Sequence, residues 1–161
     1  MKFGPGVVVL CLLLGACADL RPLENRNGAL PAYRVIEDPS ESAQPVALQV
    51  LRHLATGEIA QAAQLSNAPQ RRHQVLLDYL ASVGEEEFKR VYGEYLLPEN
   101  RVMVEIAIGP RRLIVWRLAS AGDHLAAQYY VETVGRFLMD DVPSAERRQL
   151  ARILEAYRSK R

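Results

Sequence analysis

Apolar residues change their spacing close to residue 100, and this change limits the fold class more than any other feature of the chain. In residues 46–95 they recur every three or four positions, which is typical of helices with one buried face. In residues 101–118 they alternate with polar residues, which is typical of strands. The alternating side chains that we expect to share one buried face are Val102, Val104, Ile106 and Ile108. A helical half followed by a strand half predicts an α+β domain.

Cap and turn residues divide the helical half into elements. Two short helices flank Gly57, a third follows Pro69 and ends at about Val83, and a fourth starts at Glu85. The three glutamates at the start of the fourth helix suit the positive end of the helix dipole. The chain closes with another helix from Ser144, a good N-cap residue.

Turn residues divide the strand half in the same way. A hairpin is predicted over Val102 to Leu118, with its turn at Gly109. A third strand runs from Leu125 to about Met139 and bends or breaks at Gly135. We therefore predict a globular domain over residues 45–161, with the helices covering one face of a curved antiparallel sheet and a helix at the C-terminus.

The start of this region resembles the opening of NTF2-like domains. Residues 51–58 end a helix at Gly57-Glu58, and an alanine-rich stretch, Ala62 to Leu65, follows. The resemblance covers roughly residues 45–140. It implies an NTF2-like or cystatin-like cone, in which the curved sheet wraps around the helices.

The N-terminus carries an export signal. Lys2 precedes the apolar run Val7–Leu14, which is too short to span a bilayer and is typical of a secretory signal peptide. The sequence Leu14-Gly15-Ala16-Cys17 resembles the lipobox of bacterial lipoproteins. The resemblance implies that residues 1–16 are a signal peptide, and that Cys17 carries acyl chains such as palmitate. The alternative is an ordinary signal peptide that happens to end in cysteine.

Residues after the cysteine bear on which membrane holds the anchor. In the enterobacterial lipoprotein pattern, an aspartate directly after the cysteine keeps the protein at the inner membrane. Ala18 occupies that position here, which favours the outer membrane, facing the periplasm. Asp19, one residue later, leaves the inner membrane open as an alternative.

A linker is predicted between the anchor and the domain, over residues 17–44. This stretch is rich in proline and small polar residues and has no sustained helix or strand period. One short exception is Tyr33–Ile36, which could pair as an edge strand or stay free.

Composition excludes several classes of site. Twenty basic residues balance 19 acidic ones, so no basic surplus points to nucleic acid. Both cysteines, Cys11 and Cys17, lie in the first seventeen residues, which leaves no disulfide framework and no thiolate metal site. The three histidines do not stand at metal-binding spacing. We expect no metal and no cofactor.

A pocket is one possible use of the polar and aromatic residues. His73 falls on the buried side of the third helix in a helical projection, where it could act as a base or be a core-edge histidine bonded to a carbonyl. Asp78, Trp116, Tyr129 and Glu132 could complete an acid–base and aromatic pocket with it. No nucleophile motif or phosphate-binding loop is present in the sequence.

Charged residues within the strands allow two interpretations. They could line a polar pocket on the concave face of the sheet, or they could form cross-strand ion pairs on a wet face. These residues are Glu105, Arg117, Glu132 and Arg136.

Two arginines of the C-terminal helix point away from its apolar stripe. In a helical projection Arg148 and Arg152 point almost directly away from this stripe, which consists of Leu150, Ile153, Leu154 and Tyr157. The basic residues of this segment could complement the negative end of the helix dipole. We predict instead that Arg148 and Arg152 contact a partner, either anionic lipid or an acidic protein, because a cation as early in the helix as Arg148 does not suit the dipole.

Two functions of different class remain. The first is a non-catalytic binding or scaffold module, anchored by lipid in the bacterial envelope and holding an envelope protein partner. The alternative is an enzyme of isomerase or dehydratase type, with a pocket centred on His73. Convergence of His73, Asp78 and Glu132 in one concave pocket would favour the enzyme, and dispersal would favour the module.

Overall fold

The structure of the protein is a computed structural model that describes residues 32–159. The predicted signal peptide, the anchor at Cys17 and the first part of the predicted linker lie outside the described residues. Among residues 32–159, no helix is both long enough and apolar enough to cross a membrane.

Five antiparallel strands form one open sheet, in the order in which they occur along the chain. The strands are β1 (Arg34–Val35), β2 (Arg101–Ile108), β3 (Arg111–Leu118), β4 (His124–Thr133) and β5 (Arg136–Met139). The predicted hairpin is confirmed as β2 and β3. The predicted third strand breaks into β4 and β5 at Val134 and Gly135, which both have positive φ, as a tight two-residue hairpin turn requires.

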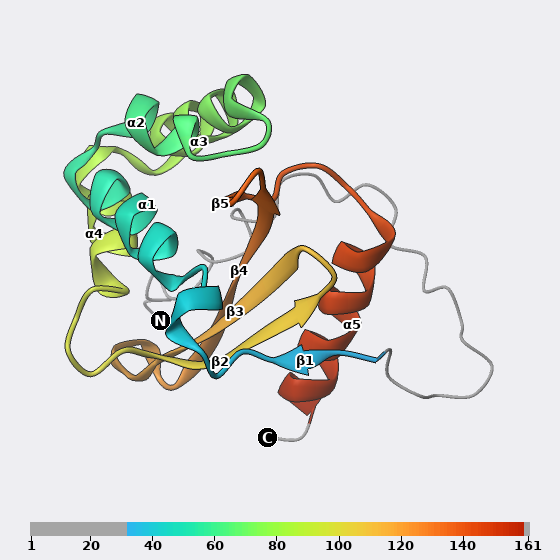
Figure 1. Ribbon diagram of the computed structural model, residues 1–161. Coiled ribbons are helices and arrows are strands. Elements are labelled where there is room, and N and C mark those ends of the chain that lie inside the picture. Colours follow the sequence, from blue (N-terminus) through green and yellow to red (C-terminus); the bar gives the residue numbers. More distant parts are fainter. Residues whose placement is uncertain (1–31, 160–161) are drawn as a thin grey trace.

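Helices cover both faces of the sheet (Figure 1). The helices are α1 (Gln44–Thr56), α2 (Ile59–Gln64), α3 (Pro69–Val83), α4 (Glu85–Glu94) and α5 (Ala145–Ser159). Two short 3-10 helices, Pro39–Glu41 and Ala119–Ala121, lie in the connections. The α+β class, the N-terminal helices on an antiparallel sheet and the C-terminal helix are all as predicted.

Each face of the sheet has its own apolar cluster. Ile114 and Trp116 of β3 pack with the helices α1–α4, whereas Leu113 and Val115 pack with α5. The N-terminal helices therefore cover one face as expected, and the C-terminal helix covers the opposite face. All four of these consecutive β3 residues are buried, and a strand buried on both faces needs a helix layer on each side.

The predicted buried face of β2 is correct for three of its four residues. Ile106 is fully buried against the α5 cluster, with Val104 and Ile108 packed beside it. Val102 packs instead against the α1–α4 cluster on the opposite side. The pairing of β2 with β3 shifts between Val102 and Val104, so that Met103 is an extra residue in the strand. Such a bulge turns the preceding side chains to the other face.

The folded part begins before residue 45. Arg34 and Val35 pair with β2, so the Tyr33–Ile36 segment supplies an edge strand. Ala43 is completely buried in the α1–α4 cluster. Residues 34–43, which the sequence interpretation placed in the linker, therefore pack on the domain.

Candidate functional site

The five predicted pocket residues do not form one pocket. Trp116 lies on the α1–α4 side of the sheet, where its ring meets Tyr95 edge-on at 5.5 Å and its indole nitrogen donates to Gln128 at 2.9 Å. Tyr129 lies on the other side, in the α5 cluster, with the Arg147 guanidinium 5.0 Å from its ring centre. The sheet separates these two aromatic side chains.

The three polar candidates are also dispersed. Asp78 is exposed on α3 and accepts a hydrogen bond from Gln74 at 2.8 Å. His73 is half-buried on the same helix. Glu132 is exposed on β4, with its carboxylate 3.8 Å from the Arg112 guanidinium. By the criterion of convergence, this arrangement does not support an enzyme centred on His73.

A different set of residues forms the inward face of α3. The projection placed His73 between Leu77 and Leu80, but Leu77 is 37% exposed. The residues of α3 that are buried are Arg72, Leu76 and Tyr79. A helical period shows which residues share a face, but the packing partners decide how far that face extends.

The most deeply buried ion pair joins Arg72 to Asp141. Both side chains are 7% exposed. The Arg72 Nε donates to Asp141 Oδ2 at 2.8 Å, a second guanidinium nitrogen donates to Oδ1, and Ser66 Oγ donates to Oδ2 at 2.6 Å. We call Ser66, Arg72 and Asp141 the Asp141 cluster. It ties the α2–α3 connection to the segment that follows β5.

Asp140 makes a second set of contacts beside this cluster. Its carboxylate accepts from Asn67 at 3.0 Å and from Arg111 at 2.9 Å. Arg147 of α5 donates to its backbone carbonyl. These contacts join the α2–α3 connection, the sheet and α5. The two aspartates after β5 therefore link both helix layers to the sheet, which is a structural role.

Glu105 is a third buried carboxylate that has a structural role. It is 2% exposed, and it accepts from Ser42 Oγ at 2.5 Å, from the Ala43 backbone N–H at 2.8 Å and from Gln44 Nε2 at 3.2 Å. Ala43 is the N-cap of α1 and has no side chain that could cap the helix. The carboxylate therefore supplies the negative charge that a helix N-terminus favours.

Four tyrosines pack together between α1–α4 and the sheet. We call them the tyrosine cluster: Tyr79, Tyr92, Tyr95 and Tyr130. Burial raises the pKa of each hydroxyl above its ordinary value of 10.0, because the apolar surroundings disfavour the charged form. All but Tyr92 have a buried hydroxyl oxygen without a hydrogen-bond partner among the described residues.

The described part of the chain contains a small cavity and an open groove. The first is about 30 Å³, enough for one or two water molecules, and its lining includes Arg72, Tyr130 and Arg147. The second is an open groove of about 480 Å³ between residues 36–39 and the side of α1 from Gln44 to Arg52.

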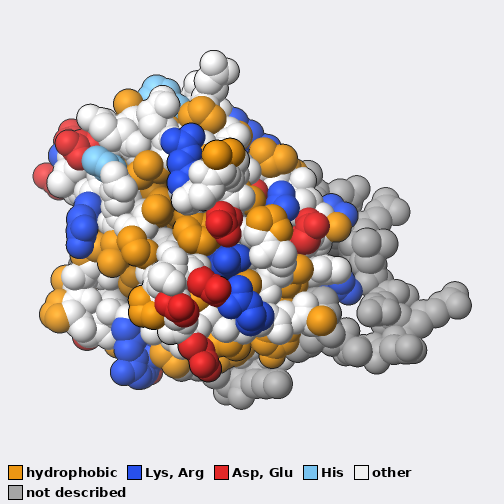
Figure 2. Space-filling view, in the orientation of Figure 1, with side chains coloured by type: hydrophobic (Ala, Val, Ile, Leu, Met, Phe, Trp, Pro, Cys, Tyr) orange, Lys and Arg blue, Asp and Glu red, His pale blue; other side chains and the backbone are white. Residues whose placement is uncertain are grey.

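Figure 2 shows acidic and basic side chains close together near the centre of one face, without a large patch of one sign.

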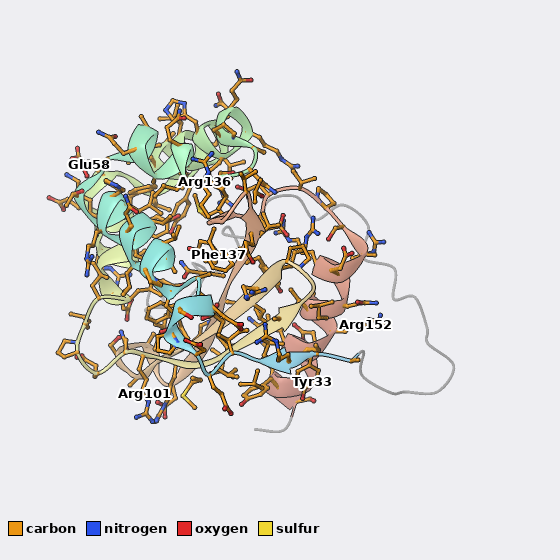
Figure 3. All side chains as sticks on the ribbon, in the orientation of Figure 1. Tyr33, Glu58, Arg101, Arg136, Phe137 and Arg152 are labelled. Atoms are coloured by element: carbon orange, nitrogen blue, oxygen red, sulfur yellow. The ribbon has the colours of Figure 1, made fainter. Side chains whose placement is uncertain are left out.

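The predicted partner face of α5 is accessible. Arg148 is exposed and Arg152 is half-buried. Figure 3 shows Arg152 on the side of α5 that faces away from the sheet. The other arginines of α5 are engaged: Arg147 contacts Tyr129, and Arg158 donates to Glu155 at 2.9 Å.

Sequence reasoning missed the Asp141 cluster and the role of Glu105. A hint was available, because a charged residue within an apolar stripe, such as Arg72 beside Leu76, predicts a buried counter-charge.

Among residues 32–159, no group of three or more histidine, cysteine, aspartate or glutamate side chains is placed to bind a metal ion. No protein-family model, no curated protein and no solved structure matches the chain.

Proposed function

We propose that the protein is a non-catalytic binding module of the bacterial cell envelope, anchored by acyl chains on Cys17 and facing the periplasm from the outer membrane. The observation that carries this proposal is the sequence Leu14-Gly15-Ala16-Cys17 directly after the apolar run of residues 7–14. The partner that the module holds is an envelope protein.

Charge alone would not keep the mature protein at a membrane. Removal of residues 1–16 takes away Lys2 and no acidic residue, which leaves a formal net charge of zero. Acyl chains supply about 0.8 kcal/mol per buried methylene, so one chain binds marginally and two or three hold a protein durably. The anchor at Cys17 is therefore the main attachment in this proposal.

The non-catalytic part of the proposal is supported by how the polar side chains are used. The predicted pocket residues are dispersed on both faces of the sheet and on α3. The buried carboxylates Glu105 and Asp141 are occupied by hydrogen bonds that hold the fold together. No observation in the described residues favours an isomerase or a dehydratase.

Fatty-acid labelling in a bacterial host tests the anchor. A clickable palmitate analogue should label the wild-type protein and a Cys11→Ser variant, but not Cys17→Ser. Cys11→Ser is the matched control, because it removes a thiol of the same leader without touching the acylation site. Label that persists in Cys17→Ser, or wild-type protein released without an anchor, would contradict the proposal.

Membrane fractionation tests the location. The labelled protein should separate with the outer membrane, and Ala18→Asp should move it to the inner membrane, whereas Ala18→Ser should not. Crosslinking in intact envelopes, followed by pull-down, then tests for the protein partner. Recovery of the chain alone under every crosslinking condition would contradict a binding module.

A further inference from the structure

We propose that the exposed side of α5 and the edge strand β1 together form a face that lies on the anionic lipid surface of the membrane carrying the anchor. We call it the anchor-side face and define it by Tyr33, Val35, Arg148 and Arg152. This inference rests on the proposed lipid anchor, and it specifies how the domain is oriented once it is anchored.

The pairing of the strands places the apolar part of this face beside α5. Val35 pairs directly with Ile106, and paired residues of antiparallel strands have their side chains on the same face. Ile106 packs against α5, so Val35 also lies on the α5 side of the sheet. The helix packs on β2, β3 and β4, and Val35 remains 44% exposed. Tyr33, just before β1, is 47% exposed.

The charged part of the face has a weak electrostatic contact with Glu146 and no closer acidic partner within the described residues. Arg148 and Arg152 take part in no ion pair there, whereas the two glutamates of α5 are held by other arginines. Glu146 lies 3.5 Å from Arg111, and Glu155 lies 2.9 Å from Arg158. The outward side of α5 therefore presents positive charge that complements phosphate headgroups.

The type of residue also suits a membrane surface. Tyrosine is favoured at the level of the headgroups, because its ring is apolar and its hydroxyl remains hydrated. Arginine beside exposed apolar residues is the usual combination for proteins that lie on anionic lipid. Figure 3 shows Tyr33 and Arg152 on the same side of the molecule, and Arg136 far from both of them.

The position of the anchor selects lipid over an acidic protein as the occupant. The chain between Cys17 and Arg34 can span at most roughly 60 Å even when fully extended. It enters the described structure at β1, whose Val35 lies on the α5 side of the sheet. Because the tether joins the domain at β1, this side of the domain can meet the membrane without the tether passing around the domain. Helices α1–α4, on the opposite face of the sheet, are then directed toward the periplasm.

Vesicle binding by the mature chain without its anchor, residues 18–161, tests the proposal. Vesicles of phosphatidylcholine mixed equally with phosphatidylglycerol should bind the wild-type chain more tightly than vesicles of phosphatidylcholine alone. Combining Arg148→Gln with Arg152→Gln should lower the partition coefficient on the anionic vesicles roughly thirtyfold. Salt at about 0.5 M should remove the difference between wild type and variant.

The matched control combines Arg52→Gln with Arg136→Gln. Both residues are exposed and make no ion pair among the described residues, and the control changes the net charge by the same amount. It should change the partition coefficient by less than about twofold, because neither arginine lies on the anchor-side face. Both double variants should unfold at the same temperature as the wild-type chain, which would show that their fold is intact.

Three results would overturn the proposal. The first is equal weakening by the two double variants, and the second is no preference of the wild-type chain for anionic vesicles. The third is normal vesicle binding by the variant with Arg148→Gln and Arg152→Gln, accompanied by loss of an acidic envelope protein in pull-downs. Because this assay uses unacylated protein, labelling at Cys17 without vesicle binding would refute only the anchor-side face. Vesicle binding without labelling would refute only the anchor.

Discussion

Replacing Asp141 with asparagine should destabilise the domain more than any other change of similar size at a charged residue. The substitution preserves the shape of the side chain and removes its charge. It leaves the Arg72 guanidinium, 7% exposed, without the carboxylate that now accepts two of its hydrogen bonds. An uncompensated charge in such surroundings is costly, because the protein interior solvates it poorly.

The structure sets the expected magnitude. Breaking a buried ion pair by removing one partner costs about 3–5 kcal/mol. Asp141 fits that case, because Ser66 also donates to it and water does not reach it easily. Since folded domains are stable by only about 5–15 kcal/mol, we expect Asp141→Asn to remove a large part of the free energy of unfolding.

Urea unfolding of the mature chain is the suitable assay. At slopes of about 1–3 kcal/mol per molar urea, the midpoint should fall by roughly 2 M with little change in slope. Glu87→Gln is the matched control, because it breaks an exposed ion pair with Arg90 and should cost about 1 kcal/mol or less. Adding Arg72→Met to Asp141→Asn removes the stranded charge and should restore part of the lost stability.

Two outcomes would refute this reasoning. If Asp141→Asn lowers the midpoint no more than Glu87→Gln does, the ion pair is not buried in solution as it is in the structure. If adding Arg72→Met destabilises the Asp141→Asn protein further, the cost does not come from an unpaired charge.

Other perturbations test other parts of the fold. Glu105→Ala should lower the free energy of unfolding by about 1–3 kcal/mol, because the start of α1 loses its acceptor; a urea midpoint equal to that of wild type would argue against the cap. Ile106→Lys should cost several kcal/mol in the same assay and Val104→Lys clearly less, since Val104 is only half-buried; the reverse order would mean that the strand faces are misassigned. His73→Ala should change stability by less than about 1 kcal/mol and leave the cellular phenotype of the protein intact, and complete loss of that phenotype with the fold unchanged would revive the enzyme hypothesis. Above about pH 10 the unfolded chain loses tyrosine protons that the folded tyrosine cluster keeps, so the contribution of this cluster to stability should be constant up to that pH and then fall as pH rises. Urea midpoints that do not fall between pH 10 and 12 would count against that burial.

The sequence predicted the elements well because they depend on local patterns. The alternation in residues 101–118 and the turn at Gly109 were sufficient for the hairpin, and Gly135 marked the break between β4 and β5. The bulge at Met103 was not predictable in this way, because the alternation of apolar residues runs through it without interruption. Only the pairing of β2 with β3 shows that Val102 has changed sides.

Contacts between distant parts of the chain were not predictable from these patterns. Glu105 was expected either to line a pocket or to form an ion pair on a wet face, but it is buried against residues more than sixty positions earlier. The pocket around His73 failed for the same reason, since its proposed members lie on different elements and faces. Local periodicity gives the face of a helix or strand, whereas the partner of that face depends on the topology.

The dependence of the helices on later residues also bears on how the chain is made. A growing chain that has emerged only as far as α4 contains Arg72 but not Asp141, and it contains the start of α1 but not Glu105. Its helices can form transiently, but they cannot pack as they do in the finished domain. Folding must therefore wait until β2–β5 have been synthesised. Under the export that we propose, this delay would keep the chain open during its passage through the membrane, and the fold would be completed on the far side.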